Sequence, residues 1–187
     1  MIASKSTPSL VVAYINELVG TGIYAEKFGA IAFHDEFMGP MTLASTVVKN
    51  TDKGINVFIN LRRPKGKATN VLAQQTQAAL SDWQQRHQVK LEDISTSWGD
   101  PLVVDDAPHL ATLLDVYSHF TGLKDPQPVS IGGSTNAKLF PEALSFGPSM
   151  PGAEYAGHSE HEFIAREQFL LNLKMYTAVF VELGRMP

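Results

Sequence analysis

Two segments of this sequence are suited to binding an anion. Arg62 stands at the end of an alternating apolar segment, and a guanidinium can hold a carboxylate through two parallel hydrogen bonds. Gly132-Gly133-Ser134-Thr135 follows a short apolar run, and glycine-rich turns can bind anions through backbone N–H groups, although this one lacks the lysine of a phosphate-binding loop. The simpler interpretations are a surface ion pair for Arg62 and a tight turn with a close backbone approach for the glycines.

Histidines and carboxylates gather in a second region, before the last helix. His158 and His161 lie in an acidic loop with Glu154 and Glu162, and imidazole is a common zinc ligand. The spacing of the two histidines suits one ion only if the turn is helical, and it matches no standard zinc motif. One interpretation is a compact metal site made by these four residues, and the other is a solvated loop. A third cluster, His34-Asp35-Glu36, is interpreted as a solvated loop because consecutive extended residues point in different directions.

Composition excludes several classes of protein. The 187 residues include no cysteine, which rules out a disulfide framework, a thiolate zinc site, an iron–sulfur cluster and a cysteine nucleophile. A net charge of −4 argues against a nucleic-acid-binding protein. No apolar run approaches the ~20 residues that span a bilayer, and residues 1–8 do not resemble a signal segment. We therefore expect a soluble, cytoplasmic protein with no membrane partner.

The first half of the chain predicts an antiparallel sheet with helices. We expect a helix over 9–19, strands over 41–49 and 55–62 joined by a turn, a helix over 67–87 and a third strand over 89–97. In the second strand Ile55, Val57, Ile59 and Leu61 share one face. The order of these elements indicates an α+β fold with the helices on one face of the sheet.

The second half predicts shorter elements. A helix should begin near Asp105, Asp106 and Pro108 and end at Gly122, followed by short strands over 128–131 and 144–147. A last helix over 162–183 carries an apolar stripe that should be buried. The residues of that stripe are Phe169, Leu173, Tyr176, Phe180 and Leu183.

Four stretches, in order along the chain, together resemble one enzyme family. They are His-Asp-Glu-Phe-Met-Gly-Pro-Met-Thr-Leu at 34–43, Asn-Leu-Arg-Arg-Pro-Lys-Gly at 60–66, Gly-Gly-Ser-Thr-Asn-Ala-Lys at 132–138, and Phe-Gly-Pro-Ser-Met-Pro-Gly at 146–152 followed by His158. The family is that of the zinc-dependent dipeptidases of the PepV and carnosinase type, relatives of aminoacylase and carboxypeptidase G. These hydrolases are metallopeptidases with two zinc ions.

The resemblance implies an organisation and a set of site residues. Residues 1–115 would be the distal part of a lid or dimerisation-type domain with a ferredoxin-like arrangement. Residues 116–187 would be the C-terminal strand–helix part of an α/β catalytic domain. Arg62 would bind the C-terminal carboxylate of a dipeptide substrate, Gly132, Gly133, Ser134 and Thr135 would line the substrate pocket, and His158 would be a zinc ligand.

The sequence also departs from the family pattern. It has no His-x-Asp motif and no Glu-Glu pair, which supply most metal ligands and the general base in the family, and Arg63 replaces a tyrosine. The resemblance therefore implies the C-terminal fragment of a dipeptidase, with no catalytic residue of its own, weak or absent zinc binding and a separate N-terminal catalytic part. The sheet on which the last helix would pack in the intact enzyme is mostly absent from this chain, so its apolar stripe would be left exposed, which predicts a homo-oligomer. The alternative is a stand-alone binding or dimerisation module without catalysis.

Overall fold

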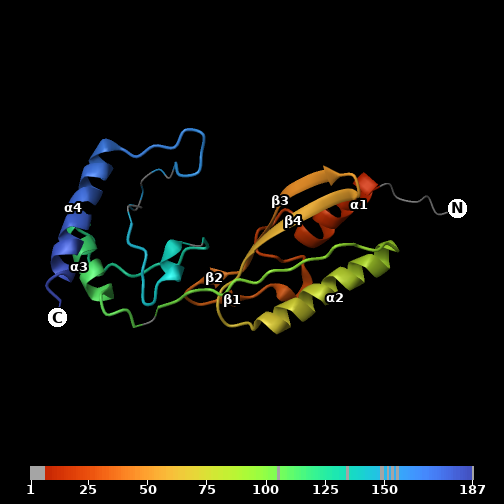
Figure 1. The fold of residues 1–187 in the computed structure, drawn as a ribbon, viewed down its shortest axis with the longest axis horizontal. Coiled ribbons are helices and arrows are strands. Elements are labelled where there is room, and N and C mark those ends of the chain that lie inside the picture. The colour runs from red at the N-terminus through yellow and green to blue at the C-terminus, as the bar shows by residue number, and fades with distance from the viewer. Residues whose placement is uncertain are drawn as a thin grey trace. The chain divides into compact units, whose positions relative to one another are not determined.

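The computed structural model describes residues 7–104, 106–133, 135–147 and 156–186, together with Met150, Gly152 and Glu154. Helices and strands are mixed along the chain (Figure 1), which confirms the α+β class. The chain divides into two compact units. The N-terminal unit contains Met1–Pro101 and Ser130–Gly133, and the C-terminal unit contains Leu102–Val129 and Ser134–Pro187.

A hairpin of two antiparallel strands is the main sheet of the N-terminal unit. It pairs β3 (Thr42–Thr51) with β4 (Gly54–Arg62), with Thr42 opposite Arg62 and an irregularity between Ser45 and Val47. Exposure alternates along β4, so that its aliphatic residues are less exposed than the asparagines between them. The predicted hairpin and its two faces are confirmed.

Helices surround this hairpin within the N-terminal unit. The predicted helix over 9–19 is found as α1 (Thr7–Tyr14) followed by one π-helical turn, η1 (Ile15–Val19). The chain then forms a 3-10 turn, η2 (Gly29–Ile31), and a small hairpin of β1 (His34–Asp35) and β2 (Gly39–Pro40). The predicted helix over 67–87 is α2 (Thr69–His87), which ends at Gln88 in a left-handed conformation.

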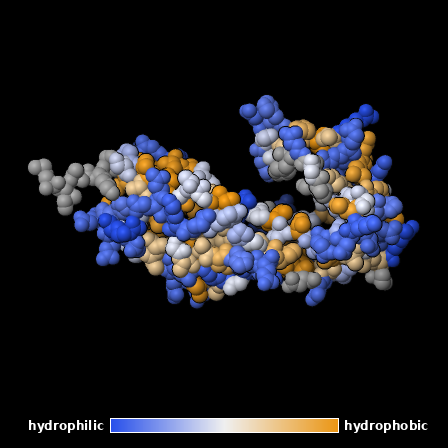
Figure 2. Space-filling model, turned by 180° about the vertical axis from the view of Figure 1, so that it is seen from behind, coloured by the Kyte–Doolittle hydropathy of each residue, from blue (hydrophilic) through white to orange (hydrophobic). Residues whose placement is uncertain are grey.

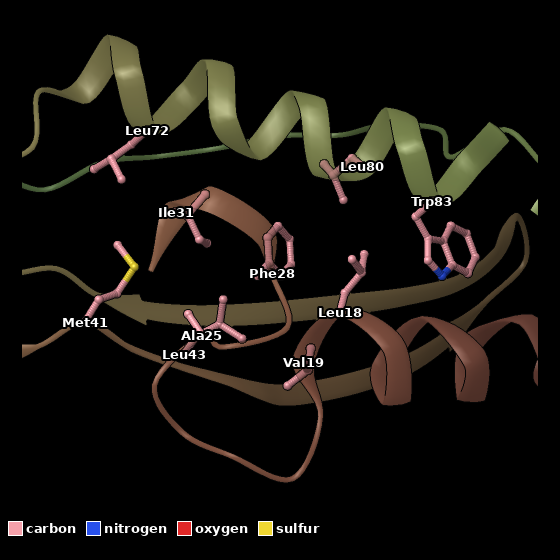
Figure 3. Close-up of a cluster of buried hydrophobic side chains, with 10 residues drawn as sticks. All are labelled: Leu18, Val19, Ala25, Phe28, Ile31, Met41, Leu43, Leu72, Leu80 and Trp83. Atoms are coloured by element: carbon pink, nitrogen blue, oxygen red, sulfur yellow. The ribbon is translucent and has the colours of Figure 1, made fainter. Parts of the chain in front are cut away.

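A single apolar cluster joins these elements. Figure 3 shows Leu72, Leu80 and Trp83 projecting from α2 toward side chains of η1, η2 and the start of β3. Trp83 is only 1% exposed, and the ring of Tyr14 meets it edge-on at 5.2 Å. Both helices and the inner face of the hairpin therefore share one core.

The prediction of a third strand over 89–97 is wrong. The first backbone N–H groups of this segment donate hydrogen bonds to helix α2 and not to a neighbouring strand. The backbone N–H of Val89 donates to the carbonyl of Gln84, and that of Leu91 donates to the Gln84 side-chain oxygen at 2.7 Å. Asp93 has a φ of 52°, which interrupts an extended run. The described part of the chain therefore has two separate two-stranded sheets rather than one larger sheet.

The C-terminal unit is built on a pair of helices, α3 (Leu110–Thr121) and α4 (Arg166–Leu183), with a short 3-10 turn, η3 (Asn136–Leu139). Helix α3 ends at Gly122, as predicted, with a φ of 72°. Neither predicted short strand, over 128–131 or 144–147, is found. Pro128 begins the first segment, Pro126 lies two residues before it, and Val129 is 81% exposed, so no ladder of hydrogen bonds forms there.

Helix α4 buries a different face from the predicted one. Its buried residues are Asn172, Met175 and Val179, whereas Phe169 is 50% and Phe180 is 77% exposed. Apolar residues occur all round α4, so the spacing alone did not identify the face that packs on α3. None of the described helices is both long and apolar enough to cross a membrane.

Candidate functional site

Arg62 is the last residue of β4 and lies on the exposed face of the hairpin. The register places Arg62 opposite Thr42, which fixes its backbone, while its guanidinium is in solvent. No residue within the described ranges forms a hydrogen bond or ion pair with this guanidinium. Its charge is therefore available to an anionic ligand rather than to the surface ion pair considered from the sequence.

The glycine-rich turn lies against Arg62. A Cβ added to Gly132 would be 3.6 Å from Cδ and 3.7 Å from Nη1 of Arg62, although the two residues are seventy positions apart. Both residues belong to the N-terminal unit. Neither Gly132 nor Gly133 has a positive φ, and a Cβ at Gly132 would make only ordinary van der Waals contact with Arg62, so what matters at Gly132 is its position next to this side chain. The structure thus brings together two of the segments expected to contact substrate.

The other residues of the predicted turn contribute less to this geometry. Ser134 lies outside the described residues. The hydroxyl of Thr135 accepts a hydrogen bond from the backbone of Ala137 at 3.3 Å and is 2.9 Å from the hydroxyl of Ser145. Thr135 therefore caps η3, which begins immediately after it.

Arg63, directly after Arg62, is buried and forms hydrogen bonds within the N-terminal unit. Its side chain is 7% exposed and donates hydrogen bonds to the carbonyls of Gly99, at 2.7 Å, and of Lys67, at 3.0 Å. The same guanidinium donates to Thr69 Oγ1 at 3.3 Å and pairs with the carboxylate of Asp100. We call these contacts the Arg63 clasp. The clasp joins the loop between β4 and α2 to the segment at which the chain leaves the N-terminal unit.

Sequence reasoning missed the clasp. It noted Arg63 only as a departure from a family pattern. Arg63 directly follows the last residue of β4, and extending the alternation of the strand by one residue would have placed it on the buried side, so the alternation was the available signal. The acceptors of Arg63 could not be found in this way because Gly99 and Asp100 are 36 and 37 residues away.

Two further charged clusters also stabilise the N-terminal unit. Lys67 Nζ donates to the carbonyl of Ala30 at 2.7 Å and lies 4.7 Å from the ring centre of Phe33, and burial lowers its pKa. Glu17 accepts hydrogen bonds from His87 at 2.9 Å and from Arg86 at 2.7 Å. The bond with His87, followed by that with Arg86, holds the pKa of Glu17 below its ordinary value.

The ligand-type residues near the C-terminus do not form a metal site in the described part of the chain. His158 is exposed with a φ of 62°, and His161 is 89% exposed beside Glu160 at 3.5 Å. Among the residues that the structure describes, which include Glu154 and Glu162, no three potential ligands come together around a common point. The compact metal site considered from the sequence is therefore not formed by these described residues, and by themselves they do not fit zinc.

The remaining cluster, at residues 34–36, is part of the small β1–β2 hairpin. Asp35 Oδ1 accepts hydrogen bonds from the backbone N–H groups of Phe37, at 3.1 Å, and Met38, at 2.8 Å. This is an Asx turn, so the carboxylate has a structural role.

Comparison with known proteins finds similarity to dipeptidases. No protein-family model matches the sequence. The chain is 26% identical over 174 residues to a beta-Ala-Xaa dipeptidase of Lactobacillus delbrueckii subsp. lactis, a match covering 92% of this chain and 35% of that protein. It is 28% identical over 171 residues to proteins of Staphylococcus aureus strains USA300 and N315 that are provisionally assigned as dipeptidases, covering 88% of this chain and 34% of theirs. The chain thus spans about a third of the length of these curated relatives, and over most of its own length it is similar to dipeptidases.

Proposed function

We propose that this chain is about a third of a dipeptidase and supplies the part that holds the C-terminal carboxylate of a dipeptide substrate. The observation that carries the proposal is the contact of Arg62 with the turn at Gly132. An unpaired guanidinium on a rigid strand beside a glycine-rich turn is suited to binding a small carboxylate. The similarity to dipeptidases over most of the chain supports this choice of ligand.

In this proposal the role of Arg62 is to position the substrate. A dipeptide carries its C-terminal carboxylate one residue beyond the peptide bond, so a fixed cation that holds the carboxylate also sets the place of that bond. Arg62 donates two parallel hydrogen bonds to the carboxylate, and Gly132 and Gly133, which belong to the same unit, line the substrate pocket beside it. Such positioning lowers the entropic part of an activation barrier without any proton transfer.

Zinc enters the proposal only as a group of the whole dipeptidase. There it would polarise the scissile carbonyl and lower the pKa of a bound water. The described residues of this chain do not fit such a site, and we propose that His158 supplies one ligand to a metal held mainly by another, N-terminal catalytic part. We therefore expect no hydrolysis by this chain alone.

We propose different roles for the two parts of the chain. Residues 1–115 act as the distal part of a lid or dimerisation-type domain, and residues 116–187 form a C-terminal segment of the catalytic domain. The proposed partners are the dipeptide, the N-terminal catalytic part and a second copy of this chain, with the protein in the cytoplasm.

Binding of a dipeptide tests the role of Arg62 directly. We would titrate the ¹⁵N-labelled chain with Leu-Gly and, as a control, with Leu-Gly amide, which lacks the carboxylate. We expect Leu-Gly alone to shift the amide resonances of Arg62 and Gly132, and Arg62→Gln to abolish the shifts. Equal shifts from the amide, or unchanged shifts in the variant, would refute the proposed role.

Metal content and hydrolysis test the proposed incompleteness. After zinc loading and desalting, we expect less than stoichiometric zinc by elemental analysis and no hydrolysis of Leu-Gly or Ala-His. Stoichiometric zinc with turnover that is lost in His158→Ala but retained in His161→Ala would overturn the proposal. That result would instead identify a complete metallopeptidase.

A further inference from the structure

Asn60 lies two residues before Arg62 on the same exposed face of β4. Side chains at this spacing along a strand are roughly 7 Å apart at their bases. Asn60 pairs with Ala44 of β3, whose side chain is a single methyl group and is also exposed. None of the residues that the structure describes forms a hydrogen bond with the Asn60 side chain. Its amide is therefore available to a ligand held by Arg62.

Position, rather than exposure, distinguishes Asn60. Figure 2 shows hydrophilic residues spread over the surface of the N-terminal unit, so the exposure of a polar side chain is not informative by itself. The corresponding position on the other side of Arg62 is Pro64, which is buried and has no hydrogen-bonding side chain. Asn60 is therefore the polar neighbour of Arg62 along this part of the chain.

The separation of Arg62 and Asn60 suits a dipeptide. When Arg62 holds the C-terminal carboxylate, the peptide N–H lies on the other side of a single Cα atom. One extended residue spans about 3.5 Å, and the hydrogen bond at each end adds ~2.9 Å. The C-terminal residue of a dipeptide can therefore bridge two polar side chains whose bases are roughly 7 Å apart.

We propose that Asn60 is a specificity-determining residue, whose side-chain oxygen accepts a hydrogen bond from the peptide N–H of a dipeptide bound to Arg62. The inference rests on the proposed function of Arg62 and deepens it by naming the substrate class, which is dipeptides with a secondary amide bond. Dipeptides that end in proline or in an N-methylated residue lack this N–H and give the Asn60 oxygen no donor. Asn60 transfers no proton, and its contact fixes the orientation of the peptide group relative to the carboxylate.

Paired titrations with leucyl-glycine (Leu-Gly) and leucyl-sarcosine test this role. Sarcosine is N-methylglycine, so leucyl-sarcosine keeps the carboxylate and has a methyl group in place of the peptide hydrogen. The amide resonance of Gly132 in the ¹⁵N-labelled chain reports the Kd of each peptide. We expect Asn60→Ala to raise the Kd of Leu-Gly by about threefold to tenfold, as for the loss of one hydrogen bond, and to leave the Kd of leucyl-sarcosine unchanged.

Two further variants separate the role of Asn60 from that of the strand and from that of Arg62. Asn56→Ala is the matched control, because Asn56 lies on the same exposed face but six residues from Arg62, roughly 20 Å along the strand, and both Kd values should stay unchanged. Arg62→Gln should abolish binding of both peptides, because both carry the carboxylate.

The outcomes distinguish this inference from the proposed function on which it rests. Unchanged binding of Leu-Gly in Asn60→Ala, equal weakening of both peptides in that variant, or an equal effect of Asn56→Ala would overturn the role of Asn60 and leave that of Arg62 intact. Binding of Leu-Gly that does not require Arg62, or no binding of Leu-Gly, would refute the proposed function together with this inference.

Discussion

Removing the donors of Arg63 should destabilise the N-terminal unit far more than the same change at Arg62. Arg63→Met keeps the aliphatic stem but leaves the carbonyls of Gly99 and Lys67 without their donor. Hydrogen bonds to charged groups contribute about 1.5–3 kcal/mol each, whereas a pair with a carboxylate as exposed as that of Asp100 contributes at most ~1 kcal/mol. The two carbonyl bonds therefore dominate, and we expect a loss of about 2–4 kcal/mol in the free energy of unfolding, allowing for partial hydration of the freed carbonyls.

Urea denaturation followed by tryptophan fluorescence measures this loss. Both tryptophans, Trp83 and Trp98, belong to the N-terminal unit, so the fluorescence change reports the unfolding of that unit. Arg62→Met is the matched control, since its exposed guanidinium has no described partner and its loss should change stability by less than ~0.5 kcal/mol. Equal stability of the two variants would refute the stabilising role of the clasp.

A local measurement distinguishes loss of the clasp from general weakening. In protein labelled with 5-fluorotryptophan, the ¹⁹F resonance of Trp98, which precedes Gly99, should shift or broaden in Arg63→Met. The resonance of Trp83 should stay in place, because Trp83 lies fourteen residues of α2 from Thr69, roughly 21 Å along the helix axis. Movement of both resonances together would contradict a local role.

Three other variants test separate features. Glu17→Gln should be less stable than the wild type above pH ~4.5, and the difference should shrink as the pH falls below that value. The reason is that the bond with His87 lowers the pKa of Glu17 in the folded state. Urea denaturation at a series of pH values measures this difference. Gly132→Ala should preserve binding of Leu-Gly, because the added Cβ makes ordinary contact with Arg62, whereas Gly132→Val should displace that side chain and weaken binding in the same titration. Gly122→Ala should cost about 1 kcal/mol, measured by thermal unfolding monitored by circular dichroism, because Gly122 ends α3 with a positive φ.

The elements that could be predicted from the sequence are those with a strong local pattern. The β3–β4 hairpin combines strict alternation with a polar turn, and α2 has apolar residues at helical spacing, so both were predicted nearly to the residue. The segment over 89–97 has a strand-like composition but forms no strand. The backbone N–H groups of Val89 and Leu91 donate hydrogen bonds to Gln84, and no local sequence pattern predicts these contacts.

The candidate site could be predicted only in its parts. Arg62 and the turn at Gly132 were each identified from local sequence, and each had a simpler interpretation. Their contact depends on tertiary structure across seventy residues, and it favours the ligand-binding interpretation because a described partner for the Arg62 guanidinium is lacking. The histidines near residue 160 show the reverse case, since suitable residue types close in sequence do not converge in space among the described residues.

The two adjacent arginines differ in exposure, and this difference separates the structural role of Arg63 from the binding role proposed for Arg62. Because successive side chains point to opposite faces, Arg63 enters the protein and must bond to carbonyls to offset the cost of its desolvation. Arg62 stays in water, where its charge costs nothing to keep unpaired and remains available to a carboxylate. Replacing Arg62 should therefore remove the proposed carboxylate binding without lowering the stability of the fold. Replacing Arg63 should lower the stability and leave binding intact, unless the clasp also orients Arg62. Measuring both properties on both variants would show whether the rigid loop after β4 is needed for binding as well as for folding.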